Sequence, residues 1–192
     1  MANYKTLVPF IKRAEGGLTK NPADTASSNP VPDGRGYHTN KGITWTVWSG
    51  FYGTDAASIK RFYDMSDDDW GVIFKKLFWN KVLADSIKSQ RIADVIVDWV
   101  WGSGFHYPEV DIQDILAHTF GEHISVDGQF GPATIAALNE SDEQKLWDTI
   151  VAKRFWYLDQ IVAIHPSNSI FLQGWKNRMN HLIEFEKSGK LV

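Results

Sequence analysis

The stretch Tyr4–Gly17, YKTLVPFIKRAEGG, determines how the rest of the chain can be organised. Its apolar residues recur at the i, i+3, i+4, i+7 spacing of one helix face: Leu7, Phe10, Ile11 and Ala14. The spacing predicts a helix over residues 2–15, which the pair Gly16-Gly17 ends. Glu15 follows Ile11 by four residues and therefore falls on the apolar face, where its carboxylate is directed towards the core.

Two interpretations of Glu15 follow from this position. Burying an ionised carboxylate without a partner costs several kcal/mol, so such groups usually hold a proton near neutral pH. A protonated carboxyl group beside a cleft is what general-acid catalysis of glycoside cleavage requires. The alternative is a glutamate at a helix end that is solvated or paired with a Lys or Arg. The residues around Glu15 favour the catalytic interpretation.

The composition narrows the class of protein. The 192 residues are 43% hydrophobic and 22% charged, which is typical of one compact globular domain or of one domain with a small appendage. The net charge of −3 argues against a general nucleic-acid binder, which usually has a basic patch. The absence of cysteine excludes disulfides and thiolate chemistry. With no signal-peptide pattern and no long apolar run, we expect no membrane insertion, synthesis in the cytoplasm, and action in the periplasm or cell wall after release by a separate route.

Residues 18–53 differ in composition from what precedes them. Asn, Pro, Asp, Ser, Gly and Thr dominate, and three prolines bar a regular helix: Pro22, Pro30 and Pro32. We predict a long loop with a short β-hairpin, folded down by its aromatic residues. Loops longer than about 12–15 residues in a compact domain are commonly functional.

The rest of the chain has the 3.6-residue period of amphipathic helices, which we predict over residues 66–80, 92–100, 112–120, 133–139, 141–165 and 168–187. Start and stop signals support several of these boundaries. Ser66 with Asp69 is a capping box, Pro132 suits a first helical position, Ser141 is a cap, and Pro166 breaks the long helix. The predicted fold class is mainly α, an α+β arrangement with a loop or hairpin lobe after the first helix.

The motifs near Glu15 resemble those of a known family. Glu15-Gly16-Gly17, Asp24 and the run Thr39–Thr44 (TNKGIT) resemble the signature of the glycoside hydrolase family 108 N-acetylmuramidases. These are lysozyme-like enzymes of bacteria and phages, and some relatives carry the label secretion activator. Later landmarks occur in the same order as in the family, so that the resemblance spans nearly the whole chain: Leu77–Asn80, Ile92–Asp98, Val126–Thr134 and Gly174–Arg178.

The resemblance implies roles for three residues. Glu15 is implied as the general acid that protonates the glycosidic oxygen between N-acetylmuramic acid and N-acetylglucosamine. Asp24 is implied to stabilise the oxocarbenium-like transition state or to orient water, and Thr39 to hold that water. Inversion requires about 6.5–9.5 Å between the two carboxyl groups.

The second carboxylate has alternatives. The stretch TASSNPVPDGRGYH between Asp24 and Thr39 departs from the family pattern. Asp24 after Pro22 equally suits an Asx-type turn or a helix cap. Asp33 is a rival second carboxylate, although Asp33-Gly34 is first a turn signal. His38 is more typical of a hydrogen-bonded loop histidine than of a catalytic base.

Aromatic residues supply candidates for saccharide contact, because sugar rings stack on aromatic faces. The candidates are Tyr37, Trp48, Trp101 and Tyr107. Core packing is the alternative for each of them. Trp99 and Trp101 lie two residues apart and cannot share one helix face, so we expect one in the core and the other towards a cleft. Gly102 stands where many relatives have an Asn.

The C-terminal part resembles a peptidoglycan-binding helical module through Val126–Thr134, VDGQFGPAT. Its Gly and Pro residues also suit a structural turn that anchors the following helices, which is the interpretation we favour. Arg178 is expected to pair with a buried carboxylate, for which Asp98 is the candidate.

These observations predict a peptidoglycan hydrolase with a lysozyme-like catalytic region over 1–105 and a peptidoglycan-binding-like region over 106–192, packed as one compact unit. The alternatives are a non-catalytic peptidoglycan-binding or secretion-accessory protein of the same fold, and a hydrolase of chitin or chitosan. We expect a monomer that binds peptidoglycan glycan strands and not nucleic acid, and that needs no metal ion and no cofactor.

Overall fold

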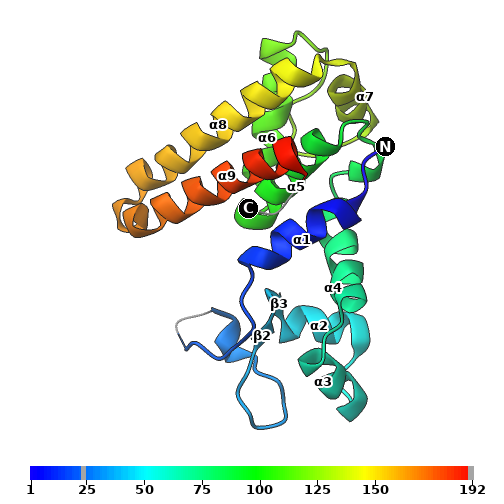
Figure 1. Cartoon of the computed structure of the whole chain (residues 1–192), viewed down its shortest axis with the longest axis vertical. Helices are drawn as coiled ribbons and strands as arrows, with labels where there is room; N and C mark the ends of the chain where they lie inside the picture. Colours follow the sequence, from blue (N-terminus) through cyan, green and yellow to red (C-terminus); the bar gives the residue numbers. More distant parts are fainter. Residues whose placement is uncertain (23–24, 190–192) are drawn as a thin grey trace. The chain divides into compact units, whose positions relative to one another are not determined.

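The computed structural model of the chain describes residues 1–22 and 25–189. It is mainly helical with a small three-stranded antiparallel sheet, which confirms the predicted fold class (Figure 1). The chain divides into two compact units, which are described separately: Val8–Leu77, here the sheet unit, and Met1–Leu7 with Phe78–Val192, here the helical unit. These units are defined by packing, and the division into regions 1–105 and 106–192 stays a prediction.

The first helix, α1 (Tyr4–Ala14), forms where the apolar period predicts it. Leu7 and Ile11 have no exposed surface and Phe10 is 6% exposed, so the predicted apolar face is buried. The helix ends one residue before Glu15. The backbone N–H of Glu15 still donates to the carbonyl of Lys12, at 3.1 Å, which continues the turn of the helix up to the carboxylate-bearing residue.

The predicted hairpin is present in the sheet unit. The strands β1 (Leu18–Thr19), β2 (Thr39–Asn40) and β3 (Ile43–Thr44) pair antiparallel in that order. Between β2 and β3, Lys41 has φ 49° and Gly42 has φ 77°. Two central residues with positive φ form the tight turn that best matches the twist of a hairpin. A short 3₁₀ helix, η1 (Thr25–Ser28), lies in the segment between β1 and β2.

The predicted loop up to Gly53 is wrong in its last part, where α2 (Trp45–Tyr52) forms. The side chain of Thr44 accepts a hydrogen bond from the Val47 N–H at 3.2 Å, which caps the helix. A further helix that the sequence analysis missed, α3 (Ala56–Tyr63), is capped by Asp55, whose carboxylate accepts from the Ser58 N–H at 2.8 Å. Local capping therefore starts both helices.

The predicted capping box is confirmed at the start of α4 (Asp67–Phe74), where Ser66 and Asp69 satisfy each other's backbone N–H groups. The helix continues as a turn of π-helix, η2 (Lys75–Trp79), close to the predicted end at residue 80. A 3₁₀ turn, η3 (Ala84–Ser86), follows within the helical unit.

The helical unit is built around α5 (Gln90–Ser103), in which every residue from Ile92 to Val100 is buried. The remaining elements are α6 (His106–Asp114) with the π turn η4 (Ile115–Thr119), α7 (Pro132–Glu140), α8 (Glu143–Ile164), η5 (Pro166–Asn168) and α9 (Ser169–Ser188). Figure 1 shows α8 and α9 side by side as a hairpin, and α8 also packs on α5.

Two predicted helix boundaries in this unit are confirmed and two are corrected, the first being the start of α6, which lies at His106 and not at residue 112. Pro132 is the first residue of α7, and α8 ends at Ile164, just before Pro166. The cap of α8 is Asp142 and not Ser141, because the Asp142 carboxylate accepts from the Lys145 N–H at 2.8 Å. The Ser141 hydroxyl instead donates to the carbonyl of Ala137 at 2.9 Å. Within the described residues, no helix has both the length and the apolarity needed to cross a membrane.

A buried charge cluster ties three of these helices together. Asp98 on α5 has no exposed surface and accepts hydrogen bonds from two guanidinium groups. Arg178 on α9 donates from Nη2 at 2.7 Å and from Nε at 3.1 Å, which confirms the predicted pair. Arg154 on α8, which the sequence analysis did not single out, donates from Nη2 at 2.6 Å.

Candidate active site

The carboxyl group of Glu15 lies against the turn between β2 and β3 in the sheet unit. A Cβ atom built on Gly42 would be 2.5 Å from Oε2 of Glu15 and 3.0 Å from its Cδ. Any side chain at position 42 would therefore overlap the carboxyl group. Glu15 itself is half-buried. The helix end thus brings the predicted acid onto the TNKGIT hairpin.

Backbone hydrogen bonds hold the segment after Glu15 to the same hairpin. The Lys41 N–H donates to the carbonyl of Gly17 at 3.3 Å, and the His38 N–H donates to that of Thr19 at 3.1 Å. These bonds pair the chain beyond the helix with β2. Glu15 and Thr39 therefore belong to one locally connected piece of structure, as the sequence motif suggests.

Side chains anchor this hairpin from the other side. Asn40 donates through Nδ2 to the carbonyl of Phe62 at 2.6 Å, and the Lys41 ammonium donates to that of Met65 at 2.7 Å. Trp70 on α4 donates from its indole N–H to the Lys41 carbonyl at 2.9 Å. A site held by such supporting contacts keeps its geometry when substrate binds.

Thr39 and His38 lie at the start of the hairpin that Glu15 contacts, and both are buried. Thr39 is 9% exposed and His38 is 1% exposed. The Nδ1 atom of His38 lies 3.2 Å from the hydroxyl oxygen of Thr39. This contact fits the hydrogen-bonded loop histidine that the sequence favours, and it orients the Thr39 hydroxyl.

The two candidates for the second carboxylate differ in what the structure says of them. Asp24 lies outside the described residues. Asp33 lies in a turn with Gly34, whose φ is 79°. Its carboxylate accepts from Nε of Arg35 at 2.7 Å and from the Tyr63 hydroxyl at 3.2 Å. Partial desolvation opposes ionisation, but the hydrogen bonds from Arg35 outweigh it and lower the pKa of Asp33. The Asp33 carboxylate is therefore already hydrogen-bonded to Arg35 in its own turn and to Tyr63.

Tyr37 and Trp48, the predicted aromatic contacts of the sheet unit, have different environments. Tyr37 is half-buried, with its ring edge-on to Tyr63 at 6.1 Å between centroids and the Lys20 ammonium 5.1 Å from its centre. Trp48 has no exposed surface, and its indole N–H donates to the hydroxyl of Ser58 at 3.0 Å. Its ring is part of the core and has no face open to a saccharide, so we leave Trp48 out of the site.

Trp101 and Tyr107 belong to the helical unit. Trp101 is half-buried and packs on Phe78 with 4.6 Å between ring centroids, while Trp99 has no exposed surface. One of the two neighbouring tryptophans is thus in the core, as expected. Tyr107 is 59% exposed, and its ring has those of His106 and Tyr157 as neighbours, with 5.2 Å and 5.9 Å between centroids.

The motif Val126–Thr134 is organised by a residue that the sequence analysis missed. Gln113, 1% exposed, accepts through Oε1 from the N–H groups of Asp127 at 3.0 Å and Gly128 at 2.8 Å. Its Nε2 donates to Asp127 Oδ1 at 3.0 Å and to the Thr134 hydroxyl at 3.2 Å. These contacts support the structural-turn interpretation of the motif.

Two more buried carboxyl groups in the helical unit were also missed. Burial, and then the neighbouring Glu186 carboxylate, raise the pKa of Asp94, which is 1% exposed. Burial is the main cause that raises the pKa of Glu109 to about 7. Within residues 1–22 and 25–189, no three His, Asp or Glu side chains come together in a way that could hold a metal ion.

Two family models and a solved structure are similar to this chain. The family model described as glycosyl hydrolase 108 matches residues 8–104, and that described as a predicted peptidoglycan domain matches residues 107–180. No curated protein matches the chain. The solved structure of SagA from Brucella abortus is similar, with a TM-score of 0.66 and 20% sequence identity over 93% of this chain and 90% of that chain. At this level of identity, the similarity shows the fold.

Proposed function

Because the chain belongs to the glycosyl hydrolase 108 family, we propose that it is an N-acetylmuramidase with Glu15 as its general acid. The family and the adjoining predicted peptidoglycan domain make it a peptidoglycan-related glycosyl hydrolase. The bond to be cleaved is the β-1,4 linkage between N-acetylmuramic acid and N-acetylglucosamine. The observation that carries the assignment to Glu15 is the contact of its carboxyl group with the backbone at Gly42.

The proposed reaction is an acid-catalysed hydrolysis of the glycosidic bond, with Glu15 as the proton donor. Glu15 donates its proton to the glycosidic oxygen while the bond from that oxygen to C1 of the muramic acid breaks, and positive charge develops on the sugar ring. A water molecule then adds to C1 and loses a proton to a second carboxylate. The half-buried position of Glu15 excludes part of the surrounding water, which strengthens its interaction with the reacting atoms.

The proposal assigns the second carboxylate to Asp24 and the water-holding hydroxyl to Thr39. Asp33 is the weaker candidate, because its carboxylate already accepts hydrogen bonds from Arg35 and Tyr63. The His38 contact that orients the Thr39 hydroxyl supports the role of Thr39. Tyr37 lies in the same unit and is our candidate for saccharide contact there, with Trp101 and Tyr107 in the helical unit.

Product analysis tests the reaction. Purified protein is incubated with cell-wall sacculi, and the new reducing ends are reduced with borohydride and identified by mass spectrometry. We expect reduced N-acetylmuramic acid. Reduced N-acetylglucosamine would contradict the assigned bond. Binding to sacculi without new reducing ends would favour the non-catalytic alternative, and cleavage of chitin oligosaccharides in preference to peptidoglycan would favour the chitinase-like one.

We also propose that the protein acts as a monomer on peptidoglycan in the periplasm or cell wall. Light scattering during gel filtration measures the first property. Fractionation of producing cells, followed by detection of the protein on the sacculi, measures the second. A stable dimer, or retention in the cytoplasm at the time of wall cleavage, would contradict these proposals.

A further inference from the structure

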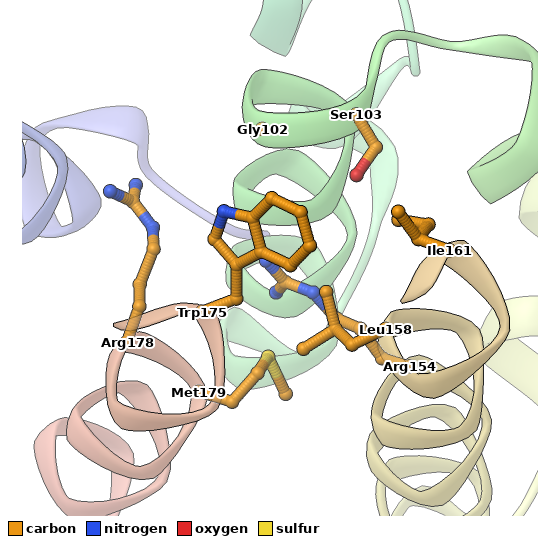
Figure 2. Close-up of a pocket in the computed structure, with 8 residues that line it drawn as sticks. All are labelled: Gly102, Ser103, Arg154, Leu158, Ile161, Trp175, Arg178 and Met179. Atoms are coloured by element: carbon orange, nitrogen blue, oxygen red, sulfur yellow. The ribbon is translucent and has the colours of Figure 1, made fainter. Parts of the chain in front are cut away.

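An open groove in the sheet unit is lined by one face of α3 and by the turn that contains Asp33 and Arg35. It differs from the pocket that Figure 2 shows between α5, α8 and α9 in the helical unit. There Arg154 and Arg178 both donate to the buried carboxylate of Asp98, so their guanidinium groups hold three helices together. Arg35 has its carboxylate partner two residues away in the same turn. None of the roles proposed above uses the groove, so it needs its own explanation.

The guanidinium group of Arg35 is held in one orientation by its neighbours. Its Nε donates to Oδ2 of Asp33 at 2.7 Å, and its Cζ lies 3.5 Å from the centre of the Tyr63 ring. The Tyr63 hydroxyl donates in turn to Oδ1 of Asp33 at 3.2 Å, and that oxygen also accepts from the Arg35 N–H at 3.0 Å. The three residues thus hold one another in place. Because the Arg35 side chain is already ordered, little further freedom is lost when it binds a ligand.

These contacts leave a defined part of the guanidinium group for a ligand. Its Nε edge faces Asp33 and one of its faces lies on Tyr63, so the opposite face and the edge with the two Nη nitrogens remain. Within the described residues, no carboxylate or carbonyl oxygen accepts a hydrogen bond from either Nη, although the Tyr63 hydroxyl lies near the group. The Arg35 side chain is 53% exposed. The N–H groups of such an edge match the two oxygens of a carboxylate.

The other residues of the groove indicate what the carboxylate is attached to. Ala56 and Ile59 add apolar surface, and Lys60 and Asp64 form a second ion pair. The side chains of that pair are 81% and 62% exposed, so either can turn to a ligand at little cost. Because each cation of the groove has an anion beside it, a polyanion gains little there. A short peptide with small apolar side chains and a carboxylate has the matching chemistry, and an uncharged glycan does not.

We propose that this groove binds the peptide stem of peptidoglycan, with a stem carboxylate on the Nη edge of Arg35. The choice of polymer rests on the proposed function. The stem begins with alanine, and the D-glutamate that follows is linked onward through its side chain, so its α-carboxylate is free wherever the wall is not amidated. Tyr37, our candidate for saccharide contact in this unit, lies edge-on to Tyr63 with 6.1 Å between centroids. The groove is therefore close enough to Tyr37 for one substrate to contact both.

Two substitutions test different parts of the groove. Arg35→Lys keeps the positive charge and removes the planar edge of N–H groups. Ala56→Leu adds bulk to the groove and leaves both ion pairs in place. Each has a matched control at an exposed position of the sheet unit that does not line the groove: Arg13→Lys on α1 and Ala57→Leu on α3. Because the two substitutions are independent, unfolding of one variant leaves the other as a test.

The experiment is a titration of the ¹⁵N-labelled full chain carrying Glu15→Gln, followed by nuclear magnetic resonance. The acidic probe is N-acetyl-L-alanyl-D-glutamate with its side-chain carboxyl group blocked as the methylamide, and its neutral counterpart has the α-carboxyl group amidated as well. We expect the acid to shift the Arg35 Nε–H and Ile59 amide signals in a saturable way and to bind at least tenfold more tightly than the neutral peptide. Arg35→Lys and Ala56→Leu should each weaken its binding at least fivefold relative to their controls.

Three results would overturn the proposal: no saturable shift with the acid, equal affinity for the acid and the neutral peptide, or equal affinity in a folded variant and its control. Shifts of the same signals by tetra-N-acetylchitotetraose and not by the peptide would also overturn it, because they would make the groove a glycan site. The peptides contain no glycosidic bond, so their binding does not depend on hydrolysis. If the acid binds but the unmutated protein releases no reducing ends from sacculi, the muramidase proposal fails and the groove proposal stands.

Discussion

The Glu15 carboxyl group occupies the space that a side chain at Gly42 would need: an added Cβ would lie 2.5 Å from Oε2. Gly42 also has φ 77°, a conformation that residues with a side chain adopt only at a cost. The hairpin turn thus meets two requirements at one residue. It closes β2 onto β3, and it leaves room for the proposed proton donor.

This relationship predicts the effect of Gly42→Ala. The substitution strains the backbone by about 1–2 kcal/mol and also displaces the Glu15 carboxyl group. Gly34→Ala is the matched control, because Gly34 has φ 79° in the same unit and nothing lies within 4 Å of its added Cβ. We expect both variants to lose thermal stability, but an activity on sacculi at least tenfold lower for Gly42→Ala than for Gly34→Ala. Equal activities in the two variants would show that the contact with Glu15 is unimportant.

The buried cluster around Asp98 predicts a large loss of stability when its carboxylate is removed. Asp98→Asn leaves Arg154 and Arg178 without their shared counter-charge, and breaking a buried pair in this way costs about 3–5 kcal/mol. Urea unfolding measures the change. Asp64→Asn removes the exposed partner of Lys60 and should change the stability little. Comparable losses in the two variants would contradict the role assigned to Asp98.

Because Asp94 is a buried carboxyl group, we expect the stability of the protein to depend on pH. Burial, and then the neighbouring Glu186, raise the pKa of Asp94 in the folded protein, so folding favours its protonated form. The associated stability is fully present below the ordinary carboxyl pKa of about 4 and is lost as the pH rises above it.

Asp94→Asn keeps the shape of the side chain and cannot ionise, so its melting temperature should fall less between about pH 5 and pH 9 than that of the unmutated protein. Gln90, which donates to Asp94 at 2.8 Å, can donate equally to an asparagine oxygen. The exposed Asp148→Asn serves as the control and should keep the original slope. A slope unchanged by Asp94→Asn would rule out Asp94 as its source.

We expect the turn at Val126–Thr134 to depend on the buried side-chain amide of Gln113. Gln113→Leu removes its hydrogen bonds to Asp127, Gly128 and Thr134 and leaves backbone groups without partners, at about 1–3 kcal/mol each where they stay buried. Hydrogen exchange of the Asp127 and Gly128 amides should accelerate at least tenfold. The exposed Gln173→Leu should leave these amides protected, and protection that survives Gln113→Leu would contradict this account.

The features predicted correctly from the sequence are those that neighbouring residues determine. The apolar face of α1, the Ser66 capping box and the break at Pro166 depend on spacing and cap chemistry alone. The cap of α8 was misplaced because Ser141 and Asp142 are adjacent residues of nearly equal capping strength. Local chemistry could not separate them.

The features that the sequence analysis missed depend on packing between distant residues. Residues 45–52 contain Gly50 and four aromatic residues with modest helix preference, yet α2 forms there because Thr44 caps it and Trp48 packs on Phe62. The burial of Trp48 and of Gln113, and the second arginine on Asp98, arise from contacts across 10 or more residues. Periodicity along the chain does not contain that information.

Hydrolysis by Glu15→Gln is the most direct test of the central proposal. The substitution preserves the size of the side chain and removes the proton that the reaction requires. The measurement is the rate of release of reducing ends from purified sacculi, with Glu140→Gln, at an exposed position on α7, as the matched control. We predict at least a hundredfold loss for Glu15→Gln, with its melting temperature close to that of the control. Release at the rate of the unmutated protein would contradict the assignment of Glu15 as the proton donor.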